Sequence, residues 1–115
     1  MDEILRALED WGCDVSGAIE RFMGDTELYM TCLKTVVDDQ AYTKLGEALS
    51  EKKKKEAFEY AHTLKGVLAN MGLTPIYAIT AQIVEPLRNG SVENLEPVYK
   101  ELITANEKLK EIIKG

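Results

Sequence analysis

Apolar residues recur at helical spacing along almost the whole chain, and the alternating pattern of a β-strand is nearly absent. Short helices are predicted over residues 2–11 and 15–23, and a glycine follows each of them. Asp25 is a suitable N-cap for a longer amphipathic element, which is interrupted at residues 38–39 and continues to residue 49. The apolar stripe of that element comprises Leu28, Tyr29, Cys32, Leu33, Val36, Tyr42, Leu45 and Leu49.

Two further helices are predicted in the second half of the chain, with a clear stop signal between them. The first spans residues 51–71 and ends at Gly72. Thr74 is the expected N-cap of the second, with Pro75 in its first turn, where the missing N–H of proline does no harm. That helix extends to about Arg88, where an Asn-Gly pair closes it.

A final helix opens at Ser91 or Asn94 and carries a regular apolar stripe. The stripe comprises Leu95, Val98, Tyr99, Leu102, Ala105, Leu109 and Ile112. Four longer amphipathic helices with short connections predict an all-α fold, an antiparallel up-down four-helix bundle. We expect one domain over residues 1–115, in which residues 1–24 form a helical cap and residues 25–115 form the bundle.

Residues 66–84 carry no charge and are long enough to span a bilayer, but they include a helix stop and a helix start at residues 72–75. We therefore interpret this stretch as the meeting of two helices. The N-terminus has neither the basic region nor the apolar run of a secretory signal. The initial methionine and the compact ending favour a free-standing protein over a piece of a larger kinase.

The composition is that of a globular protein, 45% hydrophobic and 30% charged, with a net charge of -6. This negative charge argues against nucleic acid or an anionic membrane as the main partner. Cys13 and Cys32 are far apart and outside any CxxC pattern, so they indicate neither a zinc site nor a disulfide framework. We expect a cytoplasmic protein. It should be a monomer, because no long apolar surface stripe demands a dimer.

The chain contains one histidine, His62, and its helical phase places it on the solvent side. At about 100° per residue, the core side of this helix is one broad arc. That arc comprises Ala57, Tyr60, Ala61, Leu64, Val67, Leu68 and Met71. The residues on the side of His62 are Lys55, Phe58, Glu59, Lys65, Gly66 and Ala69. Taken alone, an exposed histidine is most often a plain surface residue.

The neighbours of His62 favour a chemical role. Gly66 follows one turn later, in mid-helix, where glycine costs roughly 1 kcal/mol relative to alanine. Gly66 and Ala69 leave the imidazole open to a bulky group, and Lys65 places a cation near it. A free imidazole is largely neutral at pH 7, so a ring nitrogen offers a lone pair. An accessible nucleophile beside a cation suits an anionic group such as phosphoryl.

The sequence around His62 resembles the signature of histidine-containing phosphotransfer (HPt) domains. Residues 61–66 read AHTLKG, and Asn70 and Gly72 follow at matching positions. Upstream, residues 13–25 (CDVSGAIERFMGD) and 27–29 (ELY) look like the segment that precedes the bundle in many such domains. The resemblance covers nearly the whole chain.

This resemblance implies a four-helix bundle that carries a phosphoryl group on His62. The group would come from a receiver-domain aspartate or a sensor histidine kinase and would pass to another receiver aspartate. Lys65 would stabilise the phosphoryl oxygens, and Gly66 would give the partner access. Such a protein is a stoichiometric phosphoryl carrier rather than a turnover enzyme. No cofactor or metal site is expected on this chain, because Mg²⁺ belongs to the receiver in most such relays.

One position departs from the family pattern. Many members have a glutamine or glutamate twenty-two positions after the histidine, where it can hydrogen-bond near the ring. Here that position is Val84, with Gln82 and Glu85 close by in a different helical phase. The orienting bond is therefore either missing or made by another residue.

Lys55 and Phe58, which both precede His62 in the sequence, each leave two interpretations open. Lys55 belongs either to a solvated helix start or to a surface that attracts an acidic receiver. Phe58 either packs under an N-terminal helix or anchors a docked partner. Ala69 is also expected to belong to the partner-binding surface. The alternative function for the whole chain is a non-catalytic helical bundle that binds receiver or kinase domains without phosphotransfer.

Overall fold

The computed structural model describes residues 2–114, and within them the chain folds into seven α-helices without a β-strand. The order of these elements follows the apolar pattern of the sequence, and the all-α prediction is confirmed. The helices are α1 (Asp2–Trp11), α2 (Val15–Arg21), α3 (Thr26–Val36), α4 (Ala41–Ser50), α5 (Lys54–Asn70), α6 (Thr74–Arg88) and α7 (Glu96–Lys114).

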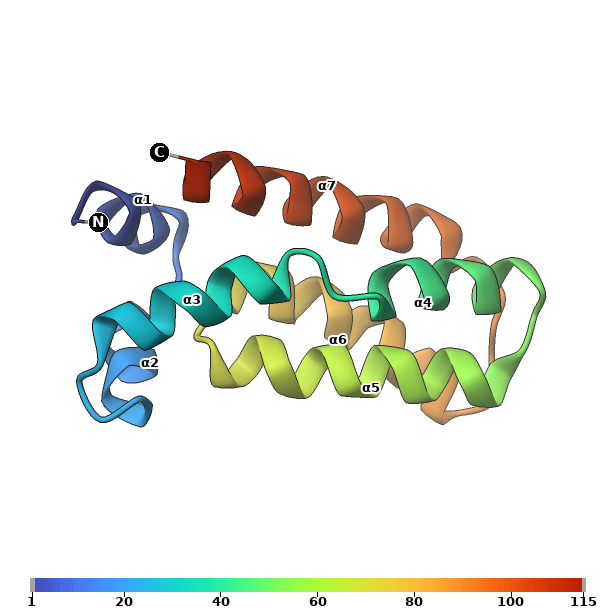
Figure 1. Cartoon of the computed structure of the whole chain (residues 1–115). Coiled ribbons are helices and arrows are strands. Elements are labelled where there is room, and N and C mark those ends of the chain that lie inside the picture. The colour runs from blue at the N-terminus through green and yellow to red at the C-terminus, as the bar shows by residue number, and fades with distance from the viewer. Residues whose placement is uncertain (1, 115) are drawn as a thin grey trace.

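Four long elements form a bundle, and α3 and α4 together make the first of them (Figure 1). These two helices follow one another along one edge, and α5 runs back beside α4. α6 packs on α5, and α7 packs on α6 and on both α3 and α4, which closes the bundle. The two short N-terminal helices lie at one end, α1 against α7 and α2 against α3. The predicted bundle with additional N-terminal helices is therefore confirmed, whereas its division at residues 24 and 25 stays a prediction.

The break between α3 and α4 falls at the two consecutive aspartates, as the sequence predicts. The carboxylate of Asp39 accepts a hydrogen bond of 2.8 Å from the backbone N–H of Ala41, the first residue of α4. The side-chain amide of Asn106, from α7, donates to the backbone carbonyl of Val37 at 3.0 Å. Both bonds satisfy main-chain groups near the ends of the interrupted helices.

Left-handed residues shift two helix boundaries from their predicted places. α2 ends at Arg21 rather than at residue 23, because Met23 has a φ of 57°. α5 begins at Lys54 rather than at residue 51, because Lys52 has a φ of 56°. A helix cannot continue through a left-handed residue, and the spacing of apolar residues does not reveal one.

The starts of α6 and α7 also differ from the prediction. Leu73 occupies the N-cap position of α6, and Thr74 is already its first helical residue. The Thr74 hydroxyl donates to a carbonyl of the preceding turn instead of capping an N–H group. α7 begins at Glu96 rather than at Ser91 or Asn94, because Asn94 is left-handed with a φ of 60°.

The inner face of α5 matches most of the arc that helical phase assigns to the core. Four of its residues and the first residue after it are buried: Ala57, Ala61, Leu64, Leu68 and Met71. Tyr60 and Val67, which the same arc includes, are only half-buried at its edges. The Lys44 ammonium of α4 lies 6.0 Å from the centre of the Tyr60 ring and partly covers that side chain.

The segment around α2 fixes the C-terminal end of α5. The Arg21 guanidinium donates to the backbone carbonyls of Asn70 and Ala69, at 3.0 and 3.1 Å. The backbone N–H of Asp14 donates to the carbonyl of Gly72 at 2.8 Å. Gly72 has a φ of 69°, and a Cβ there would overlap the backbone carbonyl of Asp14. Glycine is therefore required for this close approach, which holds the end of the site helix in place.

The uncharged stretch of residues 66–84 is divided between α5 and α6, as predicted. Across residues 2–114, no helix is both long and apolar enough to cross a membrane. The two cysteines are free thiols, Cys13 buried and Cys32 half-buried. Burial raises the pKa of the Cys13 thiol to about 11, so this thiol stays protonated at neutral pH.

Candidate functional site

His62 lies near the middle of α5, and its side chain is exposed, as helical phase predicts. Ala61 and Leu64, on the opposite side of the helix, have no exposed surface. The backbone beneath the imidazole is therefore packed into the core, while the ring itself faces outward. This arrangement presents a nucleophile on a rigid element, where a partner can reach it.

The surface that follows His62 along α5 is open. Gly66 and Ala69 are both exposed, and a Cβ added to Gly66 would find no atom within 4 Å. The backbone of Gly66 does not have a positive φ, so its conformation does not require glycine. What the missing side chain provides is free space one turn from the imidazole.

Lys65 is half-buried, and its ammonium is directed toward the neighbouring helix. Its Nζ atom lies 5.8 Å from the centre of the Tyr77 ring of α6, within the range of a cation–π contact. Because residues three positions apart share one side of a helix, Lys65 still lies beside His62. Lys65 therefore follows His62 on the same side of α5, while its ammonium lies against the Tyr77 ring.

Phe58 precedes His62 by one turn, and the two aromatic rings are stacked. Their centres are 5.4 Å apart, and their planes meet at 23°. The guanidinium carbon of Arg88, at the end of α6, lies 5.4 Å from the centre of the Phe58 ring. Phe58 is half-buried, and whether it contacts a partner stays a prediction. Its cover comes from α6 rather than from an N-terminal helix.

A basic groove of about 330 Å³ lies beside the Phe58 ring. We use this name for the cleft lined by Lys54, Lys55, Phe58, Leu87 and Arg88. Lys55 is exposed at its rim, at the start of α5. Glu85 lies 3.7 Å from Arg88, but both side chains are about half exposed, so this pair neutralises the groove only weakly. The groove therefore keeps a positive character next to His62.

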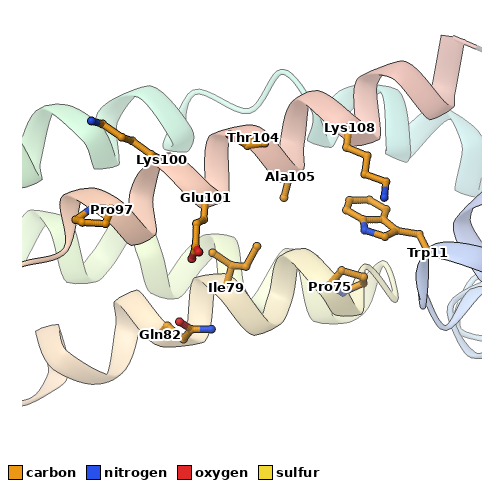
Figure 2. Close-up of a pocket in the computed structure, with 10 residues that line it drawn as sticks. All are labelled: Trp11, Pro75, Ile79, Gln82, Pro97, Lys100, Glu101, Thr104, Ala105 and Lys108. Carbon is orange, nitrogen blue, oxygen red and sulfur yellow. The ribbon is translucent and has the colours of Figure 1, made fainter.

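The residues near the family's glutamine position do not supply an orienting bond to His62. Val84 is fully buried and has no polar atom in its side chain. Glu85 is directed toward Arg88. Gln82 lines a different groove, of about 600 Å³, between α6, α7 and Trp11 (Figure 2). None of the predicted site residues lines that second groove.

The described part of the chain contains no cluster of three or more histidine, cysteine or acidic side chains that could hold a metal ion. The predicted site residues instead form one continuous strip along the outer face of α5. In chain order the strip comprises Lys55, Phe58, His62, Lys65, Gly66 and Ala69. Its chemistry is that of an exposed imidazole on a strip that also carries two lysines.

Sequence reasoning missed two residues of α6 that contact this strip. Tyr77 lies beneath the Lys65 ammonium, and Arg88 lies against Phe58. Both come from the helix that is antiparallel to α5. Which residues of α5 they contact therefore depends on how far the two helices are shifted along one another. The basic residue in the last turn of α6 was the available signal for Arg88.

Comparison with known proteins agrees with this fold. The family model described as "Hpt domain" matches residues 32–112, which is more than half of the chain. A solved structure described as the HPT domain of an Hpt sensor hybrid histidine kinase from Shewanella superposes with a TM-score of 0.74. That likeness covers 89% of this chain and 90% of the other at 21% sequence identity, so it establishes the fold. No curated protein matches the sequence.

Proposed function

The chain belongs to the Hpt domain family, the phosphotransfer modules of two-component signalling, and we propose that it carries a phosphoryl group on His62 within a multistep phosphorelay. The single observation that supports this most strongly is the exposed imidazole of the only histidine, with open space at Gly66 beside it. Its direct partners are receiver domains, a sensor histidine kinase, or both. We also propose that the protein works in the cytoplasm as a monomer.

The transfer step needs only the imidazole and the partner's phosphoaspartate. A ring nitrogen of His62 supplies the electron pair of a new N–P bond. The P–O bond to the aspartate breaks, and its electron pair leaves on the aspartate carboxylate. The proton on the other ring nitrogen stays in place. The reverse step delivers the group to a second receiver, with the N–P pair returning to the imidazole.

The strip residues divide this work. Lys65 would leave the face of Tyr77 and neutralise phosphoryl oxygens on His62, because a charged partner is worth more to it than a ring. Gly66 and Ala69 leave room for the receiver's loops. Lys55, at the rim of the basic groove, attracts the acidic surface around the receiver's aspartate. Phe58 offers that surface an apolar contact. Mg²⁺ in this reaction belongs to the receiver.

A transfer experiment tests the proposal. The protein is incubated with phosphorylated receiver domains of its host that carry a labelled phosphoryl group. Label stable to alkali and labile to acid should appear on the wild type and be lost in His62→Gln. Lys100→Gln, an exposed change on α7, serves as the matched control and should keep the label. Label that persists on His62→Gln would disprove the assignment.

The buried Val84 favours one alternative, a bundle that binds receiver or kinase domains without accepting phosphate. Under this alternative, no phosphohistidine forms with any receiver of the host. Binding of the same receivers would survive His62→Gln unchanged. The two functions are thus separated by the combination of a binding assay and the transfer assay on one pair of proteins.

A further inference from the structure

The imidazole of His62 needs something to orient it, because an exposed ring on a helix has several accessible rotamers. The position that often supplies a hydrogen bond in the family is occupied by Val84, which is buried and apolar. Glu85 pairs with Arg88, and Gln82 lines the groove of Figure 2. The ring's contact in this structure is aromatic instead.

We propose that Phe58 is the positioning residue for His62, and that Arg88 in turn holds Phe58. This inference rests on the proposed function and specifies how its site is held. The ring centres lie 5.4 Å apart with planes 23° from parallel, which is offset stacking of a favourable kind. The Arg88 guanidinium lies 5.4 Å from the same phenyl ring. A cation–π contact and a stack therefore link α6 to the imidazole through one side chain.

The structure around Phe58 explains why this side chain can act as a support. Its ring is half-buried, with Leu87 and Arg88 of α6 beside it in the basic groove. Residues four positions apart face each other on a helix, so the Phe58 ring stands where it limits rotation of His62. The support is apolar and makes no hydrogen bond, so both ring nitrogens stay available.

The size of the effect follows from the rotamers that Phe58 suppresses. A helical histidine released from the stack would sample about two χ1 wells and two broad χ2 wells, which leaves roughly one orientation in four productive. The maximal rate of phosphoryl transfer should then fall by roughly two- to sixfold. Affinity for the receiver should change little when an apolar side chain stays at this position, since the docking contact of Phe58 needs only an apolar surface.

The test compares Phe58→Leu with Phe58→Tyr in the full chain. Leucine keeps an apolar side chain against α6 but has no aromatic face, whereas tyrosine keeps the stack. For each variant, the transfer rate is measured against receiver concentration. The positioning role predicts a lower maximal rate for Phe58→Leu at an unchanged half-saturating concentration, and recovery in Phe58→Tyr. A raised half-saturating concentration with an unchanged maximal rate would overturn it.

A second readout needs no partner. Because the chain has one histidine, the ring-proton NMR signals of His62 can be assigned without ambiguity. The stack predicts that these signals lie upfield in the wild type, move downfield in Phe58→Leu, and return in Phe58→Tyr. Arg88→Gln should shift them in the same direction by a smaller amount. Arg6→Gln, a matched change on the exposed face of α1, should leave them in place.

The two readouts separate this inference from the proposed function. If no receiver phosphorylates the wild type, the proposed function fails, while the NMR signals still report whether Phe58 holds the ring. If transfer occurs but Phe58→Leu leaves both the ring signals and the maximal rate unchanged, the positioning role is wrong and the phosphoacceptor role stands.

Discussion

Gly66→Ala should stabilise the protein, although it lies beside the reactive residue. An alanine in a helix interior is favoured over glycine by about 1 kcal/mol. The added Cβ would meet no atom within 4 Å, so nothing in the packing offsets this gain. For a domain of this size, about 1 kcal/mol corresponds to a rise in Tm of roughly 3–6 °C. Thermal and urea unfolding followed by far-ultraviolet circular dichroism measure both quantities.

Gly46 provides the matched comparison, because it too lies inside a helix without a positive φ. A Cβ there would overlap the hydroxyl and ring of Tyr99, whose hydroxyl donates to the backbone carbonyl of Tyr42 at 2.8 Å. The lost hydrogen bond and the overpacking outweigh the gain in helix propensity. Gly46→Ala should therefore lower the free energy of unfolding by about 1–3 kcal/mol.

The functional half of the same prediction uses a larger side chain. Gly66→Leu should fold as stably as the wild type but lower the transfer rate on the order of 10–100-fold, because it displaces the partner from the imidazole. Should Gly66→Ala be neutral or destabilising, or Gly66→Leu transfer at the wild-type rate, the argument that glycine is kept here for access would be refuted.

Three further predictions concern the fold that supports the site. Gly72→Ala should lower the free energy of unfolding in urea by about 2–4 kcal/mol. The substitution strains a positive φ and breaks the hydrogen bond from the backbone N–H of Asp14. Gly90→Ala is the control: its Cβ would have open space, so it should lower the free energy of unfolding by only about 1–2 kcal/mol. Tyr29→Phe should cost about 1–2 kcal/mol by the same measurement, because its buried hydroxyl donates to a main-chain carbonyl at 2.8 Å. Burial raises the pKa of Cys13 from 9.0 to about 11, so the thiol of the unfolded chain ionises first and stability should fall as pH rises from about 9 to 11. Cys13→Ala should flatten that pH dependence, and an unaltered slope would show that this thiol is not its source.

The face of α5 that carries the site could be predicted from the sequence, because one helix has one geometry. A rotation of about 100° per residue is enough to place His62 and Gly66 outside and Leu64 inside. The cost of a mid-helix glycine likewise marks Gly66 as unusual from its position in the sequence alone. These are local properties, and local reasoning is sufficient for them.

The contacts between helices could not be predicted in the same way. Arg88 meets Phe58, and Tyr77 meets Lys65, only because of how far α6 is shifted along α5, and that shift depends on the turn at Gly72 and on core packing. The late starts of α5 and α7 likewise depend on left-handed residues that apolar spacing does not mark. Phe58 shows the difference between the two kinds of contact most clearly. It stacks on His62 of its own helix, whereas Arg88, which covers it, belongs to α6.

The most direct test of the account is to locate the phosphoryl group after transfer. The wild-type chain is incubated with a phosphorylated receiver, digested under alkaline conditions, and fragmented gently in a mass spectrometer so that the N–P bond survives. We predict that a single phosphoryl group lies on His62 and disappears when an unphosphorylated receiver is added. A phosphoryl group on any other residue, or none with every receiver of the host, would contradict the central claim.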